Sequence, residues 1–492
     1  MSKQSFANDV VMIAITNILT SLGAFLLLPV ITKTLGAYDY GIWAQISVTV
    51  SLLSSIALMG LSMALIRFLA AEKDGHRIKE GFYSISVVVA LSGFITSLIV
   101  FALADFMAIT IFSDAGTSHY IKAGSFLILL TSLDQIVMFY FRIFRQIRTY
   151  ALITLFNTFG RLALILGLLH IGLGLMGVIA AVLFIQVAVF LGAISCIINQ
   201  IGFAIPKFTM IKEYLRYGLP LTPNSLIRWI TDSSDRYIVG ILLGMNAVGI
   251  YSAAYAIGSL VQLLVTPIQL ILFPELSKMY DENRLDEVKL YLSYSLKYFL
   301  LLGIPSVVGM SVLSRAILEI LTKPEFSSGS SVIPFVALAG LMGGVFQIVI
   351  NINFLVKRTT SNLFIHIIAA ATNIILNVML IPLIGILGSA IATFVAYLFM
   401  IIVVFYISLK YISFDICWSF IAKSIISSTF MVVIILIIYP KTVIDLFVSV
   451  IIAIIVYFIM ILSLGGLSKT EIKITKRYFY KIFKAIKTYT KN

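Results

Sequence analysis

Four charged side chains lie within an apolar stretch that is long enough to cross a membrane, residues 219–243. They are spaced at i, i+4, i+7 and i+8, so a helix would place them on one face. A charge at bilayer depth costs at least about 2.5–3.5 kcal/mol, and such residues normally face a bundle interior or a watery cavity. The spacing therefore predicts a polar, largely cationic chamber inside the membrane. The four residues are Arg228, Asp232, Asp235 and Arg236.

Two arginines fall near the middle of predicted spans in different halves of the chain. At 1.5 Å per residue, Arg161 lies about 15 Å and Arg228 about 13 Å from the cytoplasmic ends of their predicted spans. Guanidinium groups match the geometry of phosphate oxygens, so the two arginines predict a site for an anionic group. A structural alternative pairs Arg228 with Asp232, and Arg161 with Asn157 or a backbone carbonyl, as contacts between helices.

Three further charged residues fall inside predicted spans. Asp134 lies in the inner half of its span, where it could pair with an arginine, contact sugar hydroxyls or carry a proton. Asp235 and Arg236 reach the outer half of theirs, where they either join the chamber or neutralise each other as an outer latch. We include all three, together with Asn157, in the predicted substrate cavity.

A cluster of three arginines follows the span that holds Asp134. Its first interpretation is an anchor on the cytoplasmic side, where Lys and Arg gather in membrane proteins. Its second is a cytoplasmic gate that attracts phosphate. The cluster consists of Arg142, Arg145 and Arg148.

Amide side chains also occur at depth in several predicted spans. Hydrogen bonding between helices is their default role. A sugar-binding cavity would need the same groups. These amides are Asn17, Gln45, Asn157, Gln262, Gln269, Gln347, Asn351, Asn373 and Asn377.

The other chemistry-bearing residues argue against an enzyme or a metalloprotein. The two cysteines, Cys196 and Cys417, lie far apart, and the four histidines have no Cys or carboxylate at ligand spacing. We therefore expect no disulfide framework, no metal site and no cofactor. The sequence has no nucleophile–base pair and no phosphate-binding glycine loop, which excludes ATP hydrolysis by this chain.

The composition requires that membrane helices position these residues. Of the 492 residues, 61% are hydrophobic and 11% are charged, and the mean hydropathy is +1.09, which is too apolar for a soluble domain. Apolar runs of about 20 residues favour helices over a barrel. We predict an all-α integral membrane protein with about fourteen transmembrane helices, at residues 8–31, 41–66, 82–104, 121–141, 151–170, 175–198, 219–243, 248–272, 291–313, 331–355, 363–383, 386–409, 419–439 and 443–464.

The distribution of positive charge orients these helices. With the N-terminus inside, Lys and Arg in the inside segments outnumber those in the outside segments by roughly five to one. Both termini are therefore predicted to be cytoplasmic, in a multi-pass protein of the cell membrane. The net charge of +14 reflects this asymmetry and needs no nucleic acid as a partner. We expect the basic, amphipathic tail at 468–492 to lie on the anionic inner leaflet or to dock another protein.

The chain carries an internal duplication. The pattern LGxxxxGI followed by an aromatic residue occurs at 35–43 and 243–251, and two further matches keep nearly the same offset, 207 to 211 residues. Because the repeat contains six helices, both copies have the same polarity, which predicts two parallel six-helix lobes that rock around a substrate between them. The predicted divisions are an N-terminal lobe (1–199), a cytoplasmic linker (200–218), a C-terminal lobe (219–409), two extra helices (410–467) and the tail (468–492).

Three segments together resemble a known family: LPVITKTLGAYDYGIW at 28–43, the Asp235-Arg236 pair, and 243–251. They are similar to the polysaccharide-biosynthesis transporters, the O-antigen-type or Wzx-like flippases of the MOP superfamily, over essentially the whole chain. The resemblance implies a MATE-like architecture that moves a polyprenyl-pyrophosphate-linked oligosaccharide, on an undecaprenyl or dolichol carrier, from the cytoplasmic to the outer leaflet. It implies a role in cell-surface polysaccharide synthesis, for example of O-antigen and lipopolysaccharide. Membrane lipids and glycan polymerase or ligase proteins are the expected partners.

Three alternative functions fit the sequence less well. A MATE-type drug or cation antiporter usually has twelve spans and an acidic residue within its first helix, whereas Asp9 lies only at the edge of the first span here. A lipid II-type flippase typically has arginines in its first helices, and the first span has none. A scaffold that transports nothing would have no use for Arg161 and Arg228 at mid-depth.

Overall fold

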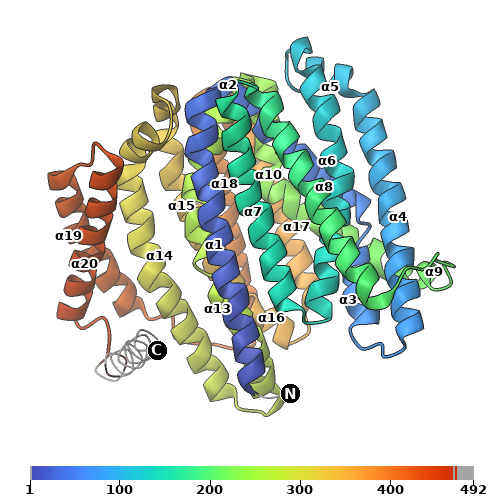
Figure 1. Ribbon diagram of the computed structural model, residues 1–492. Helices are drawn as coiled ribbons and strands as arrows, with labels where there is room; N and C mark the ends of the chain where they lie inside the picture. Colours follow the sequence, from blue (N-terminus) through green and yellow to red (C-terminus); the bar gives the residue numbers. More distant parts are fainter. Residues whose placement is uncertain (1–2, 469–470, 472, 474–492) are drawn as a thin grey trace, which may run out of the picture.

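The computed structural model describes residues 3–468, 471 and 473, and all secondary structure among them is helical. The elements of the first half of the chain (Figure 1) are α1 (Lys3–Leu35), α2 (Ala37–Ala57), α3 (Leu61–Leu69), α4 (Gly75–Ala102), α5 (Ala104–Thr110), η1 (Ala115–Thr117), α6 (Ser118–Ile143), α7 (Ile147–His170), α8 (Gly174–Ile201), α9 (Ile211–Gly218) and η2 (Leu219–Leu221). Those of the second half are α10 (Thr222–Leu243), α11 (Met245–Gly258), α12 (Leu260–Leu263), α13 (Thr266–Asp281), α14 (Leu285–Leu321), η3 (Pro324–Ser331), α15 (Val332–Val349), α16 (Asn351–Leu355), α17 (Thr359–Ile384), α18 (Ile386–Ser408), α19 (Trp418–Ile438) and α20 (Val443–Ser463).

The predicted all-helical membrane fold is confirmed, and each predicted span has a helical counterpart in the structure. Within the described residues, thirteen segments are long and apolar enough to cross a membrane. Helix α10 differs from them because it carries four charged residues, although its 22 residues are long enough to span. With α10 included, the helices match the fourteen predicted spans in chain order.

Three of the predicted spans are broken well inside their predicted bounds. The span at 41–66 is interrupted where Met59 and Gly60 have positive φ, between the end of α2 and the start of α3. The span at 248–272 is divided among α11, α12 and α13, and the span at 331–355 between α15 and α16. Hydropathy cannot reveal such breaks, because the residues on both sides are equally apolar.

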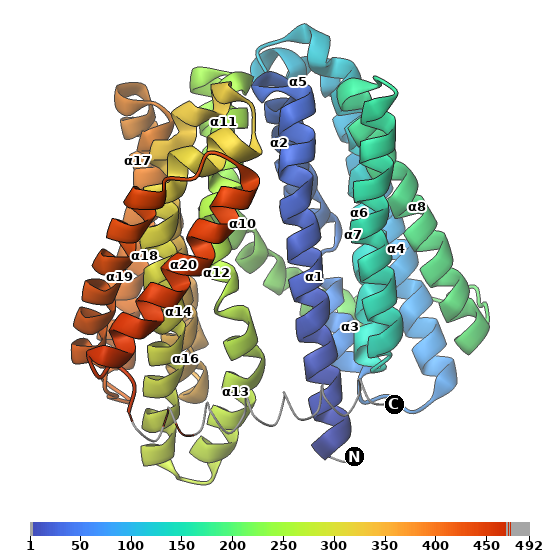
Figure 2. The same cartoon turned by 60° about the vertical axis from the view of Figure 1, so that its left-hand side comes forward.

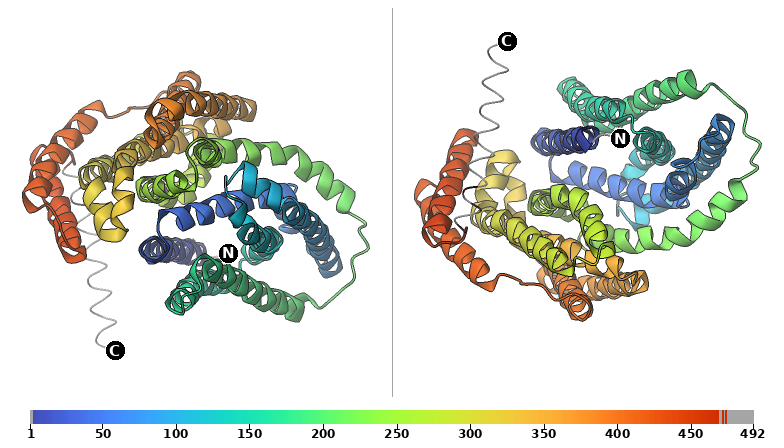
Figure 3. Two further views of the ribbon diagram at one scale, coloured as in Figure 1. Left: turned by 90° about the horizontal axis from the view of Figure 1, so that it is seen from above. Right: turned by 90° about the horizontal axis from the view of Figure 1, so that it is seen from below.

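The helices form two bundles. Helices α1–α8 make the N-lobe and α10–α18 the C-lobe, as Figure 2 shows, while α19 and α20 pack against α14 at the edge of the C-lobe (Figure 3). At the end of the molecule opposite the N-terminus, α2 packs against α10 and α11 of the other bundle. Toward the end that carries the N-terminus, the helices of the two bundles diverge (Figure 2).

The α2–α11 contact pairs equivalent residues of the duplication. A Cβ atom added to Gly41 would lie 1.9 Å from the carbonyl oxygen of Met245, and one added to Gly249 would lie 1.9 Å from that of Ala37. The turns before the two helices are also alike, since Gly36 has φ 88° and ψ 177° and Gly244 has φ 81° and ψ 177°. A local two-fold axis therefore relates the two lobes at this crossing.

The segment predicted as a linker, 200–218, is partly helical. Its last eight residues form α9, which packs against α3 of the N-lobe. Glu80 of α4 accepts hydrogen bonds from the backbone N–H groups of Lys207 and Thr209, at 2.9 and 3.3 Å. The linker is thus attached to the N-lobe. Apart from Ser468, Glu471 and Lys473, the predicted tail at 468–492 lies outside the described residues.

Candidate functional site

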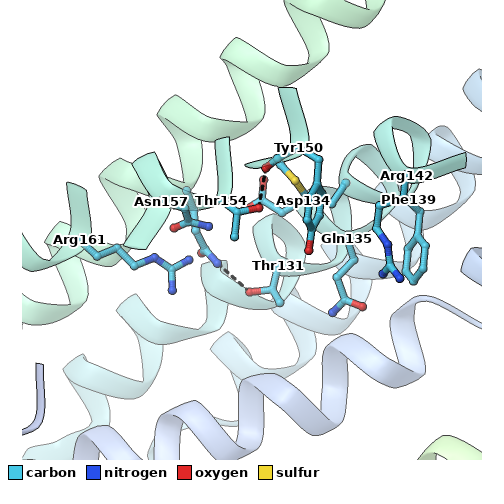
Figure 4. A pocket seen from close by; sticks show the side chains of 11 residues that line it. Thr131, Asp134, Gln135, Phe139, Arg142, Tyr150, Thr154, Asn157 and Arg161 are labelled. Carbon is cyan, nitrogen blue, oxygen red and sulfur yellow. Dashed lines mark hydrogen bonds between the residues drawn. The ribbon is translucent and has the colours of Figure 1, made fainter. Parts of the chain in front are cut away.

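A cavity of about 390 Å³ lies within the N-lobe, between α6, α7 and α8. Most of the side chains that line it are polar or charged, which is unusual inside a membrane bundle. They come from three helices (Figure 4): Thr131, Asp134, Gln135, Met138, Phe139 and Arg142 from α6; Tyr150, Thr154, Asn157 and Arg161 from α7; and Gln186 from α8. We call this the N-lobe cavity.

Asp134 is the buried charge of the N-lobe cavity. Only 8% of its surface is exposed, and neither carboxylate oxygen has a hydrogen-bond partner among the described residues. Arg161 acts on it electrostatically, but the described contacts include no ion pair between them. The Nε of Arg161 and the Oδ1 of Asn157 are also buried without a partner. The carboxylate and the guanidinium thus line one cavity with their hydrogen-bonding capacity unused.

Only one of the three predicted gate arginines lines the N-lobe cavity. Arg142 is in the last turn of α6, with its guanidinium carbon 5.4 Å from the ring centroid of Phe139 and 5.9 Å from that of Tyr150. In the view of Figure 4 it and Arg161 lie at opposite ends of the row of lining side chains. Arg145, in the turn between α6 and α7, and Arg148, in the first turn of α7, do not line the cavity.

A second polar cavity, of about 210 Å³, lies within the C-lobe. We call it the C-lobe cavity. Arg228 and Asp232 of α10 both line it, one helical turn apart. The Tyr397 hydroxyl donates a hydrogen bond of 2.8 Å to the Asp232 carboxylate. The complete lining is Arg228, Thr231, Asp232, Gln262, Gln269, Gly343, Phe346, Gln347, Ile350, Phe354, His366, Tyr397 and Met400.

Arg228 is the free cation of the C-lobe cavity. Its side chain is exposed, about 9 Å from the start of α10 at 1.5 Å per residue. It makes no hydrogen bond or ion pair among the described contacts. Asp232, the partner that the sequence suggested, accepts a hydrogen bond from the Tyr397 hydroxyl instead. The cavity therefore keeps an unpaired guanidinium for a ligand.

Asp235 and Arg236 line neither cavity. Arg236 Nη1 is 3.0 Å from Asp235 Oδ1, and the Tyr251 hydroxyl donates to Asp235 Oδ2 at 2.5 Å. The Arg236 guanidinium carbon also lies 4.2 Å from the ring centroid of Tyr255. The two charges thus neutralise each other between α10 and α11. Of the two roles that the sequence left open for this pair, mutual neutralisation agrees with these contacts, and a place in the chamber does not.

The structure places Arg161 and Arg228 in two cavities, one in each lobe, whereas the sequence predicted a single chamber with a shared phosphate. The reason is packing: α7 lies against α1 and α8, and α10 lies against α17, so each arginine faces its own lobe. The sequence also missed Gln186, Tyr397 and His366 as lining residues. The presence of amide side chains at depth in the predicted spans was the signal for Gln262, Gln269 and Gln347.

Comparison with known proteins connects this fold to glycan synthesis. The model of the family described as "Polysaccharide biosynthesis protein" matches residues 30–331. The probable flippase AglR of Haloferax volcanii is 32% identical over 191 residues, which are 37% of this chain and 38% of AglR. The probable low-salt glycan biosynthesis flippase Agl15 of the same organism is 28% identical over 194 residues, 38% of this chain and 40% of Agl15. The chain thus matches about two fifths of the length of these curated relatives.

Solved structures agree on the fold over nearly the whole chain. The lipid II flippase MurJ, in an inward closed conformation, has a TM-score of 0.73 at 18% identity, covering 92% of this chain and 98% of MurJ. An inward-facing multidrug resistance MATE family transporter of the MOP superfamily has a TM-score of 0.67 at 14% identity, covering 82% of this chain and 98% of that one. The MATE-like architecture predicted from the sequence is confirmed. The chain is a multi-pass membrane protein that belongs to the polysaccharide biosynthesis protein family.

Proposed function

We propose that the protein is a flippase that carries polyprenyl-pyrophosphate-linked oligosaccharides from the cytoplasmic to the outer leaflet, for cell-surface polysaccharide synthesis. One observation carries the proposal: each lobe contains a polar cavity with an arginine on a spanning helix, Arg161 in one and Arg228 in the other. The polar, anionic headgroup of a lipid-linked glycan supplies partners for such groups where the bilayer cannot. The polysaccharide biosynthesis family and the relatives named as flippases, one of them of glycan biosynthesis, support a flippase of this kind.

The arrangement of the lobes supports transport by alternating access. Transporters built from two similar bundles expose a site to one side at a time when the bundles rock against each other. Here the lobes are in contact at one end and diverge at the end that carries the N-terminus (Figure 2). With a cytoplasmic N-terminus, as the positive charges favour, this is an inward-facing state ready to receive a substrate made in the cytoplasm. Glycan polymerases or ligases would act on the delivered product.

Transport in proteoliposomes tests this proposal. The full-length protein is reconstituted with an undecaprenyl-pyrophosphate-linked glycan, and a membrane-impermeant oxidant of sugar diols measures how much glycan reaches the other leaflet. We expect the wild-type protein to move the lipid, and Arg228→Ala and Arg161→Ala to move it at background rate while inserting normally. The reason is that each substitution removes an arginine of a spanning helix from the lining of one cavity.

Arg315→Ala is the matched control for these variants. Arg315 is exposed and pairs with Glu319 on α14, outside both cavities, so its loss should leave transport unchanged. Normal transport by both cavity variants would remove the role of the arginines. Failure of the wild-type protein to move lipid-linked glycans would refute the proposed function itself.

A further inference from the structure

The buried polar atoms of the N-lobe cavity that have no partner are mostly hydrogen-bond acceptors. Four buried oxygens have no partner among the described residues: both carboxylate oxygens of Asp134, Oδ1 of Asn157 and Oε1 of Gln186. The amide nitrogen of Gln186 is already used, because it donates to Thr131 Oγ1 at 3.0 Å. The one unpaired buried donor that lines the cavity is Nε of Arg161. Four acceptors therefore face one such donor.

The C-lobe cavity has the opposite bias. Its buried unpaired group is a donor, Nε2 of Gln269. Its carboxylate, Asp232, already accepts the hydrogen bond from Tyr397. The guanidinium of Arg228 adds further donors that no described residue accepts. This cavity therefore offers unpaired donors, among them the guanidinium of Arg228.

Buried polar groups need partners, because an unsatisfied one costs about 1–3 kcal/mol. A pyrophosphate has acceptor oxygens only, so it can satisfy Arg228 and Gln269 but not the four oxygens of the N-lobe cavity. A sugar hydroxyl donates one hydrogen bond and accepts others, so a pyranose ring can satisfy Asp134, Asn157 and Gln186 and still accept from Arg161.

We propose that the two lobes divide the substrate between them: the N-lobe cavity holds sugar hydroxyls, with Asp134 as their main acceptor, and the C-lobe cavity holds the pyrophosphate on Arg228. This assignment rests on the proposed function and deepens it. It makes Asp134 a residue that determines glycan specificity, and it gives Arg161 a sugar hydroxyl as its partner in place of a phosphate.

Charge and size favour a sugar over the other donors that could fill the N-lobe cavity. A cation would face the guanidinium groups of Arg161 and Arg142 as well as the single carboxylate of Asp134, so it would meet net positive charge. Water also satisfies acceptors, and a cavity of about 390 Å³ has room for several molecules, at roughly 30 Å³ each in the liquid, which a sugar ring would displace. The cavity also falls in the volume range of small-molecule sites, and the rings of Phe139 and Tyr150 give a sugar an apolar face.

Binding of lipids with and without a sugar separates the two cavities. The probes are undecaprenyl pyrophosphate alone and the same lipid carrying glucose, galactose or N-acetylglucosamine, titrated into the full-length protein in nanodiscs. We expect at least one glycosylated lipid to bind the wild-type protein more tightly than the sugar-free lipid. Asp134→Asn should erase most of that difference, about tenfold for a lost charge-assisted contact, and leave the sugar-free affinity unchanged. Arg228→Gln should weaken all four lipids about equally.

The variants are chosen so that folding does not decide the result. Asp134 loses no protein hydrogen bond on becoming asparagine, because its oxygens have none, and Asn157→Ala provides a second change in the same cavity that should act like Asp134→Asn. The inference is overturned if Asp134→Asn weakens the sugar-free lipid as much as the glycosylated ones, or if no glycosylated lipid binds the wild-type protein more tightly. If the wild-type protein binds none of the four lipids, the proposed function fails.

Discussion

Asp235 and Arg236 show how a membrane helix can carry two charges for structural reasons alone. Asp235 is 1% exposed and Arg236 is 9% exposed. Besides each other, they have the Tyr251 hydroxyl, the Tyr255 ring and the backbone carbonyl of Asp232, which accepts from Arg236 Nη1 at 3.1 Å. A buried pair with this many partners is costly to break, because the remaining charge stays buried without compensation.

We predict that Asp235→Ala lowers the free energy of unfolding by about 3–5 kcal/mol, the usual cost of leaving one member of a buried ion pair alone. Thermal unfolding in detergent measures it. The double variant Asp235→Ala/Arg236→Leu should be less destabilised than the single one, because no orphaned charge remains. Tyr255→Phe is the mild control, since it keeps the ring beside Arg236 and removes a hydroxyl whose hydrogen bond to the Asp232 carbonyl is long, at 3.5 Å. A single variant that melts like the wild-type protein would show that the pair is not structural.

At the residue scale, the sequence identified the charged groups of α10 but not their partners. The i, i+4, i+7, i+8 spacing correctly puts four charges on adjoining faces of α10. It cannot show that the Tyr251 hydroxyl of α11 donates a hydrogen bond to Asp235, whereas the Tyr397 hydroxyl of α18 donates one to Asp232. Those tyrosines lie 16 and 165 residues away in the chain, so the division of the four charges into an ion pair and a cavity depends on helix packing.

At the scale of elements, the α2–α11 crossing leaves no room for side chains. Gly41 and Gly249 each face the backbone of the opposite helix, at the distances given above. Small residues at such positions let transmembrane backbones approach closely. The crossing joins the two lobes, so its tightness affects how firmly they close at this end.

We predict that Gly41→Ala and Gly249→Ala each separate α2 from α11 and lower the thermal stability in detergent by about 1–3 kcal/mol, the range for overpacking. The separation follows because a methyl group cannot lie 1.9 Å from a carbonyl oxygen. Gly192→Ala is the matched control: Gly192 is within α8, and an added Cβ has nothing within 4 Å. There alanine should be neutral or stabilising by up to about 1 kcal/mol. Equal effects of Gly41→Ala and Gly192→Ala would contradict the tight crossing.

The existence and order of the spanning helices were predictable from hydropathy, because each needs about 20 apolar residues whatever its neighbours are. The breaks were not. Residues 248–272 look like one span, yet the chain is divided after Gly258 and again between Leu263 and Thr266. The duplicated glycines were visible in the sequence, but a repeat does not show that Gly41 and Gly249 meet each other.

At the scale of the whole molecule, η3 of the C-lobe holds the ends of two N-lobe helices. Lys323 Nζ donates to the carbonyl oxygen of Thr34 near the end of α1, at 3.2 Å. Glu325 accepts from the backbone N–H of Ala37, the first residue of α2, at 2.8 Å. Each charge thus meets the helix end whose dipole it complements. Glu325 also replaces the side-chain cap that Gly36 cannot supply. We call these two contacts the η3 clamp.

The η3 clamp is therefore expected to favour the state in which the lobes touch at this end. Each exposed helix-end contact contributes about 0.3–1 kcal/mol, so removing both should shift the equilibrium between the two transport states by roughly three- to thirtyfold toward separation at this end. The variant Lys323→Gln/Glu325→Gln removes both charges and keeps both side chains close to their original size.

Electron paramagnetic resonance measures the shift in this equilibrium. Spin labels are attached at the exposed residues Ala115 of the N-lobe and Ser328 of the C-lobe, in a background where Cys196 and Cys417 are replaced by serine. We expect a larger population of long distances in the variant. The pair Arg315→Gln/Glu319→Gln removes the same two charges from a salt bridge that lies entirely within α14, so its distance distribution should match that of the parent. Identical distributions for the clamp variant and the parent would show that the clamp does not set the balance between the two states.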